Sequence, residues 1–340
     1  MTAHVVAPSQ LRHWIAALLS AAHVPEGEAQ LIAAVRLEAA LRDPLGFDSF
    51  AARSLGHVVE RLQAGGLNPR PTIRLVHEAG PLALMDGDGG IGQLVGVRAM
   101  EHCLLLAEAH GLGLVGVRRS SSLGAMAYYA MMALSREGIG FAATNTELRI
   151  GMPPWGGMTQ TLGNNPFAMA IPVAEGPPIV VDMSLTATEP QAEQAGTMAH
   201  RQALLGGGNV ARAVMGGHKG YALAVALEVM CGVLTGAGFG LAHAHERIGS
   251  FATPPDLGHL FMAVDIKRLL PLPLFQERAS TLIQQLRASE LAEGAERIWL
   301  PGELEFRRRE VRLRDGIPLA EDALTTLQAA AHDLGRQLEI

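Results

Sequence analysis

The glycine run Gly111-Leu-Gly113-Leu-Val-Gly116 constrains the fold of this chain more than any other feature of its sequence. Its letters match the G-x-G-x-x-G spacing of a Rossmann unit, in which a strand precedes the glycines and a helix follows them. Here the order is reversed, because an apolar helical pattern over residues 95–110 precedes Gly111 and a buried-strand pattern over 112–117 follows it. We therefore interpret Gly111 as a helix C-cap that leads into a strand.

Helical and strand patterns are mixed along the whole chain, which predicts an α/β or α+β fold and not a repeat array. We expect two helices within residues 8–41 and further helices at 50–64, 95–110, 125–135, 220–236, 276–288 and 322–338. The expected strands cover residues 73–76, 82–86, 112–117, 139–144, 179–183 and 260–265. Glycine clusters between these segments indicate tight turns or close backbone approach to a ligand.

The composition excludes several classes of protein. The chain has 340 residues, of which 49% are hydrophobic, and a formal net charge of −6. It has no block rich in Lys and Arg, which argues against binding to nucleic acid. Its only cysteines, Cys103 and Cys231, exclude a disulfide framework and a cysteine zinc site, and we expect no bound metal. Without a signal peptide pattern or a membrane-spanning run, we expect a cytoplasmic protein that does not bind a membrane.

Two groups of histidines have different local chemistry. His243 and His245 have i, i+2 spacing in a Gly/Ala-rich stretch, which favours a solvated surface pair over a metal site. His218 and Lys219 lie in a glycine-rich turn before an apolar helix. Such a turn suits the capture of a phosphate or carboxylate, because backbone N–H groups and the lysine charge act at one point. From the residues alone, a solvated helix cap is the favoured interpretation.

Seven segments of the sequence occur in the order and context of one known family. They are Asp86–Gln93, Ala143–Thr146, Pro153–Gly157, Leu162–Pro166, Val181–Ser184, Gly216–Tyr221 and Pro301–Glu303. With these segments the chain resembles the malate/L-lactate/ureidoglycolate dehydrogenase family. This is a group of non-Rossmann NAD(P)-dependent oxidoreductases that also includes diketogulonate reductase and piperideine-2-carboxylate reductase.

The resemblance implies a mixed α/β fold of the non-Rossmann type, with a helical N-terminal segment at residues 1–70. It implies a core and dimerisation domain formed by residues 71–117 and 265–340, and an inserted nucleotide-binding domain at 118–264. It also implies a homodimer that acts on a small-molecule substrate.

The cofactor implied by the resemblance is NAD or NADP. The residues that fall where the family contacts this cofactor are Thr146, Asp182, Met183, Ser184, Lys219, Pro301, Gly302 and Glu303. Lys219 would supply the positive charge that a pyrophosphate requires, and the turn Gly163–Pro166 would let the backbone approach the cofactor closely.

The chain departs from the family pattern at the positions of its acid/base groups. The family's Asp-Ser-His-Gly motif reads Asp48-Ser-Phe-Ala51 here, and Ser54 replaces the arginine that can hold a substrate carboxylate. The family's Ser-Asn-His-Phe-Gly motif reads Ser120-Ser-Ser-Leu-Gly124. The stretch between Ser184 and Gly216 is also shorter than in the family. Phenylalanine cannot transfer a proton, and serine is a poor acid or base without a partner.

Three hypotheses about function remain open from the sequence. The chain is an oxidoreductase that reduces a cyclic imino acid or a 2-oxo acid derivative without the family's histidines. Alternatively, it is a lyase, cyclase or isomerase that uses the old pocket, or it is a catalytically inactive dimeric protein. The residues that could replace the missing acid/base groups are Ser122, Ser121, Ser49 and His218. His57, two turns along the helix from Phe50, is a further titratable group but is better explained as a half-buried helix residue.

Overall fold

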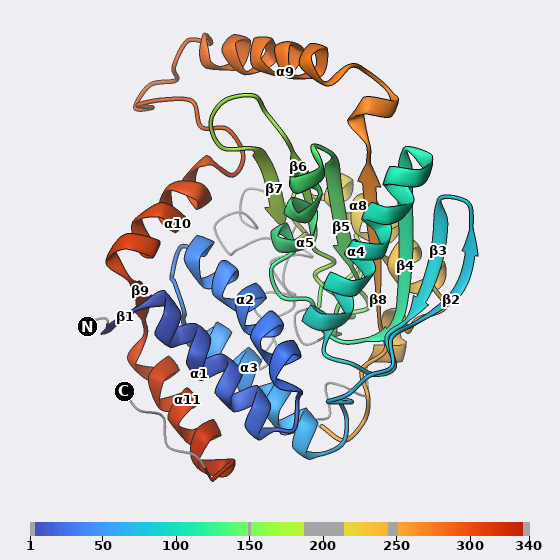
Figure 1. The fold of residues 1–340 in the computed structure, drawn as a ribbon, viewed down its shortest axis with the longest axis vertical. Helices are drawn as coiled ribbons and strands as arrows, with labels where there is room; N and C mark the ends of the chain where they lie inside the picture. The colour runs from blue at the N-terminus through green and yellow to red at the C-terminus, as the bar shows by residue number, and fades with distance from the viewer. Residues whose placement is uncertain (1–3, 149–150, 187–213, 244–250, 336–340) are drawn as a thin grey trace.

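The computed structural model describes residues 4–148, 151–186, 214–243 and 251–335. At its centre lies a seven-stranded sheet in the order β2-β3-β4-β8-β5-β6-β7 (Figure 1). The only parallel pair among the described strands of this sheet is β3 with β4. The strands are β2 (Arg74–Ala79), β3 (Leu82–Asp86), β4 (Leu112–Ser120), β5 (Ile139–Thr144), β6 (Phe167–Ile171), β7 (Ile179–Met183) and β8 (Leu257–Val264).

Helices cover both faces of this sheet. On one face, α4 (Gly92–His110) and α5 (Ala127–Met132) share a buried core with alternate strand residues such as Phe261 and Ala263. On the other face, α8 (His218–Glu228) and the π-helical turn Val229–Val233 pack over residues such as Leu260. Because successive strand side chains point to opposite faces, this alternation identifies β8 as a strand that is covered on both sides.

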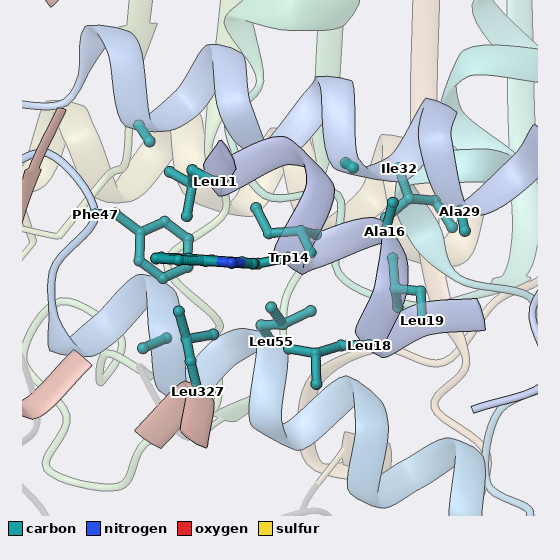
Figure 2. Close-up of a cluster of buried hydrophobic side chains, with 14 of the residues drawn as sticks. Leu11, Trp14, Ala16, Leu18, Leu19, Ala29, Ile32, Phe47, Leu55 and Leu327 are labelled. Atoms are coloured by element: carbon teal, nitrogen blue, oxygen red, sulfur yellow. The ribbon is translucent and has the colours of Figure 1, made fainter. Parts of the chain in front are cut away.

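A helical bundle with its own core lies beside the sheet. It contains α1 (Pro8–Ala21), α2 (Glu26–Arg42), α3 (Ser49–Gln63) and the C-terminal helix α11 (Glu321–Asp333). Figure 2 shows Trp14 of α1 among Leu11, Phe47, Leu55 and Leu327, so that residues far apart in sequence form one apolar cluster. The two-stranded sheet of β1 (His4–Val6) and β9 (Ile317–Leu319) joins the two ends of the chain.

The structure confirms the mixed α/β class and the interpretation of Gly111. This glycine has a φ of 85° and ends α4, and its N–H donates to the Ala107 carbonyl at 2.7 Å. The strand β4 then begins at Leu112. The G-x-G-x-x-G letters here therefore describe a helix end, as expected.

Three strands and one α-helix were not expected from the sequence, and several bounds differ. The unexpected elements are the strands β1, β6 and β9 and the helix α10 (Glu303–Asp315). The helix α9 (Leu272–Arg287) begins before the expected residue 276, and α8 begins at His218 and not at residue 220. The expected helix over 125–135 is α5 followed by the 3-10 turn Ala133–Arg136.

Two expectations concern the chain as a whole. In the described part of the chain, no helix is both long and apolar enough to cross a membrane. The division of the chain into three domains stays a prediction.

Candidate functional site

The candidate residues that follow the strands come together because of the sheet topology. Strands β4, β5 and β7 run in one direction, and β6 and β8 run in the opposite direction. The carboxyl ends of β4, β5 and β7 therefore share an edge of the sheet with the amino ends of β6 and β8. We call this edge the site edge. Ser121 and Ser122, Thr146, and Asp182 to Ser184 all lie at it.

Thr146 and Asn164 join the end of β5 to the start of β6. The Thr146 hydroxyl donates to Asn164 Oδ1 at 2.6 Å and accepts the Asn164 N–H at 2.9 Å. A Cβ on Gly163 would lie 2.2 Å from Thr146 Oγ1, so only glycine fits between these two residues. The close backbone approach expected at Gly163 therefore serves this contact within the protein.

Asn165 fixes the turn against α8. It is buried and has a φ of 35°, and its side-chain N–H groups donate to Glu228 at 2.7 Å and to the Ala224 carbonyl at 3.1 Å. The other oxygen of Glu228 accepts the Gly240 N–H at 2.8 Å. This buried network holds α8 in a fixed position relative to the start of β6.

The N-terminus of α8 carries His218 and Lys219 at the surface. The chain reaches it through Gly216 and Gly217, which have φ values of 67° and 63°. Both His218 and Lys219 are exposed, and the His218 ring lies 6.1 Å from Trp155. Met215 N–H donates to the Leu185 carbonyl at 2.8 Å, which attaches this turn to the chain just after β7. Among the described residues, Lys219 has no acidic partner.

Four of the predicted cofactor residues line one cavity. It has a volume of about 450 Å³ and lies between the end of α2, the start of α5, β7 and the turn before α10. Asp182, Met183, Pro301 and Gly302 line it. The Pro301 carbonyl accepts the Val180 N–H at 3.0 Å, which holds this turn against β7. We call this cavity the Arg42 pocket, after the only basic residue in its lining.

Arg42 is a residue of this site that the sequence analysis missed. It keeps only 6% of its surface exposed, and its guanidinium lies 4.5 Å from the centre of the Phe306 ring. Its Nη1 is buried and has no hydrogen-bond partner among the described residues. Burial lowers the pKa of Arg42, while the negative charges of Glu38, Asp182 and Glu305 raise it. A buried donor without a partner is a group that a ligand can satisfy.

Asp182 lies at the mouth of the same pocket. The residue is exposed, but its Oδ2 is drawn under α5 and accepts the Ala127 N–H at 3.0 Å. Desolvation of the carboxyl in the pocket raises its pKa from 3.8 to about 6, against the opposing effects of the Ala127 N–H and the Arg42 charge. Asp182 is therefore a hydrogen-bond acceptor whose pKa lies above that of an ordinary aspartate.

The remaining predicted residues differ in their exposure and in whether other groups of the protein already occupy their side chains. Ser122 is exposed, whereas Ser121 is buried and accepts the Gly92 N–H at 2.8 Å. Ser184 shares a hydrogen bond of 2.9 Å with Thr186. Glu303 forms ion pairs with Arg287 and Arg297 and accepts the Leu300 N–H, so that its carboxylate is occupied within the protein.

The helix α3 presents the altered motif. Its N-cap is Asp48, which accepts the Ala51 N–H at 2.9 Å, and Ser49 is its first residue. Phe50 follows with 58% of its surface exposed. His57 packs on Phe251 with a ring distance of 5.5 Å. Most of the shortened stretch between Ser184 and Gly216 lies outside the described residues.

A second residue that the sequence analysis missed is His259, at the site edge in β8. It is fully buried between the neighbouring strands, and its Nδ1 lies 2.7 Å from the Thr144 hydroxyl. Burial lowers its pKa from 6.5 to about 3, so that the imidazole is neutral. An apolar strand pattern that contains one histidine was the only sequence signal for it.

Two further features of the described residues were compared with the site: possible metal-binding clusters and a second, larger cavity. The described residues contain no group of three or more His, Cys, Asp or Glu side chains placed to hold a metal ion. A cavity of about 790 Å³ lies between the end of α3 and Pro254–Asp256, and it contains none of the predicted site residues. The Arg42 pocket is smaller, but four of the predicted cofactor residues line it.

Comparisons with known proteins identify the family and the fold of the chain. The family described as malate/L-lactate dehydrogenase matches residues 6–328. The chain is 31% identical to a malate dehydrogenase of Pyrococcus abyssi over 96% of its own length and 94% of that protein. It is 29% identical to an L-sulfolactate dehydrogenase of Methanocaldococcus jannaschii over 98% of both chains. The solved structure of malate dehydrogenase from Pyrococcus horikoshii OT3 superposes with a TM-score of 0.84 at 30% identity, covering 98% of this chain and 97% of that one.

Proposed function

Because the chain belongs to the malate/L-lactate dehydrogenase family, we propose that it is an NAD(P)-dependent oxidoreductase acting on a small organic acid. The observation that carries this proposal is the Arg42 pocket. Four of the eight residues predicted to contact the cofactor line this pocket together with a buried, unsatisfied arginine donor. Relatives include proteins named malate, L-sulfolactate and ureidoglycolate dehydrogenase, the last with NAD⁺ in its name.

The donors and acceptors at the site edge fit a dinucleotide. A cavity of about 450 Å³ is within the range of ligand pockets, and its lining offers an acceptor for a ribose hydroxyl at Asp182. The N-terminus of α8 offers backbone N–H groups and the Lys219 ammonium to a pyrophosphate. When bound, the nicotinamide would supply the hydride.

The residues near the start of α3 favour a substrate that needs no protonation. Phe50 occupies the first turn of α3 and cannot donate a proton to a carbonyl oxygen. Ser122 is exposed and can donate a hydrogen bond but is not acidic near neutral pH. The nitrogen of a cyclic imino acid is already protonated, so its reduction depends mainly on positioning. We therefore rank a cyclic imino acid above a 2-oxo acid derivative as the substrate.

We also propose that the chain forms a homodimer. The outward face of α8 and the turn that continues it exposes Leu223, Val225, Val229, Val233 and Leu234. Between Leu223 and Leu234 the single charged residue is Glu228, which points inward to Asn165. A large exposed patch of this kind is typical of a protein interface. Since most soluble homo-oligomers have two-fold symmetry, we propose that a second copy covers it.

The substrate proposal is tested by a panel of cyclic imino acids and 2-oxo acids with NADH and NADPH. We expect measurable turnover of an imino acid and little of any 2-oxo acid. The variant Phe50→His should raise turnover of 2-oxo acids, by up to the 10²–10⁴-fold that a general acid contributes, and leave imine reduction nearly unchanged. Ordinary turnover of a 2-oxo acid by the unmodified chain, at about 10 s⁻¹, would contradict the proposal.

A further inference from the structure

Buried polar groups gather around the segment Ser120–Gly124, which carries one of the altered family motifs. Three of their atoms have no hydrogen-bond partner among the described residues: Gln93 Oε1, Ser120 Oγ and His259 Nε2. Gln93 of α4 reaches the end of the segment, since a Cβ on Gly124 would lie 3.3 Å from its Nε2. Buried polar atoms without a partner are rare in folded proteins, so their concentration around one segment indicates a role beyond packing.

His259 connects this segment to the end of β5. Its Nδ1 lies 2.7 Å from Thr144 Oγ1. The same hydroxyl lies 2.6 Å from the carbonyl oxygen of Asn145 and 3.1 Å from that of Gly258. Thr146, a predicted cofactor residue, follows two positions after Thr144. The imidazole is therefore held against the part of the site edge at which we expect the cofactor.

The second ring nitrogen is the one available to the Ser121 backbone. Burial lowers the pKa of His259 to about 3, while the backbone carbonyls of Gly258 and Ser121 act in the other direction. Because Nδ1 is already engaged, Nε2 is the nitrogen that remains for Ser121. The Ser121 carbonyl oxygen also lies against the start of α4, where a Cβ on Gly92 would be 2.1 Å from it. The peptide that precedes Ser122 is thus confined by α4 and by His259.

We propose that His259 is a positioning residue, which fixes the Ser122 hydroxyl relative to the cofactor end of β5. The inference rests on the proposed function, in which Ser122 donates a hydrogen bond to the substrate and the nicotinamide supplies the hydride. His259 is fully buried, so it acts through Ser122 and not on the substrate directly. A misplacement of about 1 Å can lower a rate by roughly 10²-fold, which is why the distance between the two halves of the site matters.

The test measures steady-state reduction of two probes, Δ1-piperideine-2-carboxylate and Δ1-pyrroline-2-carboxylate, with NADH and NADPH. His259→Phe keeps an aromatic ring and removes both nitrogens. It should lower kcat by about tenfold or more, as expected for a misplaced donor, with little change in KM or in the dissociation constant of the dinucleotide. Thr144→Val should have a similar effect, and the double variant should be no slower, because both changes break one contact. His259→Gln restores a polar group and should recover part of the lost turnover.

Two controls separate positioning from a general loss of stability. In a Ser122→Ala background, His259→Phe should have little further effect on kcat, because His259 acts through Ser122. Leu327→Ala removes buried packing in the helical bundle, away from the site edge, and should lower the unfolding temperature without changing kcat. Circular dichroism verifies that each variant is folded at the assay temperature. If His259→Phe does not fold, Thr144→Val with and without Ser122→Ala makes the same comparison.

The outcomes separate this inference from the proposed function. An unchanged kcat in folded His259→Phe would overturn the inference and leave the proposed function standing. Equal losses with and without the Ser122 hydroxyl, or the same loss in Leu327→Ala, would do so as well. If the unmodified chain reduces none of the imino acids and 2-oxo acids of the panel with either dinucleotide, the proposed function is wrong and this inference falls with it.

Discussion

At the scale of single residues, the site edge combines exposed groups that can meet a ligand with buried groups that hold the backbone. Ser122 and Lys219 are exposed, whereas Asn165 and His259 are buried and bonded to neighbouring elements. The buried groups act on function only through the exposed ones, because they fix where the strand ends and the α8 N-terminus lie. Substitutions of these buried residues should therefore lower the stability of the fold before they change ligand binding.

His259 should make the stability of the fold depend on pH. Its pKa falls from 6.5 to about 3 on burial, so between these values the unfolded chain binds a proton that the folded chain does not. This contribution is fully present above pH 6.5 and is lost as the pH falls towards 3, by about 1.4 kcal/mol per pH unit. His259→Gln should therefore flatten the dependence of the unfolding temperature on pH between 6.5 and 4.5.

Thermal unfolding followed by circular dichroism at several pH values measures this slope. The control is His332→Gln, because the side chain of His332 on α11 is 91% exposed and its change should leave the slope unaltered. If His259→Gln retains the slope of the unmodified chain, the buried imidazole is not the group that titrates.

At the scale of elements, the function depends on how α8 is attached to the sheet. The Asn165–Glu228 network and the Met215–Leu185 hydrogen bond fix its N-terminus beside the ends of β5 and β7. The helix therefore presents Lys219 at the site edge without using the lysine to hold the fold. This separation of roles can be tested by substitution.

Lys219→Ala should weaken NAD(P)H binding by about 1.5–3 kcal/mol, the range for a hydrogen bond to a charged group. Lys219→Arg should restore only part of this loss, because a planar fork does not occupy the place of a point charge. Lys267→Ala is a suitable control, since Lys267 is an exposed lysine paired with Glu137 outside the site. Titration calorimetry gives the affinities. Equal affinity of Lys219→Ala and the unmodified chain would remove Lys219 from the cofactor site.

Sequence patterns predicted elements with strong periodicity and missed those stabilised by distant partners. The helix α10 consists mostly of charged residues, and its arginines find Glu38 and the Asp43 carbonyl only in the folded chain. The strand β6 contains Ala and Met, which have little strand preference, and it forms because β5 and β7 flank it.

The resemblance assigned Asp182 and Pro301 to the cofactor contacts, and both residues line the Arg42 pocket. Their contact with a cofactor stays a prediction. The resemblance could not identify Arg42, because the aromatic ring beneath its guanidinium, Phe306, is separated from it by most of the chain. Nor could it show that the Glu303 carboxylate is occupied by Arg287 and Arg297. Local sequence carries no information about which charges become paired in the fold.

At the scale of the whole molecule, the exposed apolar face of α8 should determine the oligomeric state. The double variant Leu223→Glu/Val229→Glu places two charges on this face, and we expect it to convert a dimer into a monomer without unfolding. Light scattering coupled to size exclusion measures the mass. A control with one charge elsewhere, Leu105→Glu on the exposed side of α4, should remain a dimer. A monomeric unmodified chain at micromolar concentration would refute the proposal.

Calorimetric titration of the unmodified chain with NADH and then with NADPH tests most directly whether a nicotinamide dinucleotide binds at the site edge. We expect saturable binding of one molecule per chain by at least one of the two, with a dissociation constant of roughly 1 μM–1 mM, the range common for the Michaelis constants of enzymes. If neither dinucleotide binds at millimolar concentration, the Arg42 pocket and Lys219 are not parts of a dinucleotide site and the proposed function is wrong.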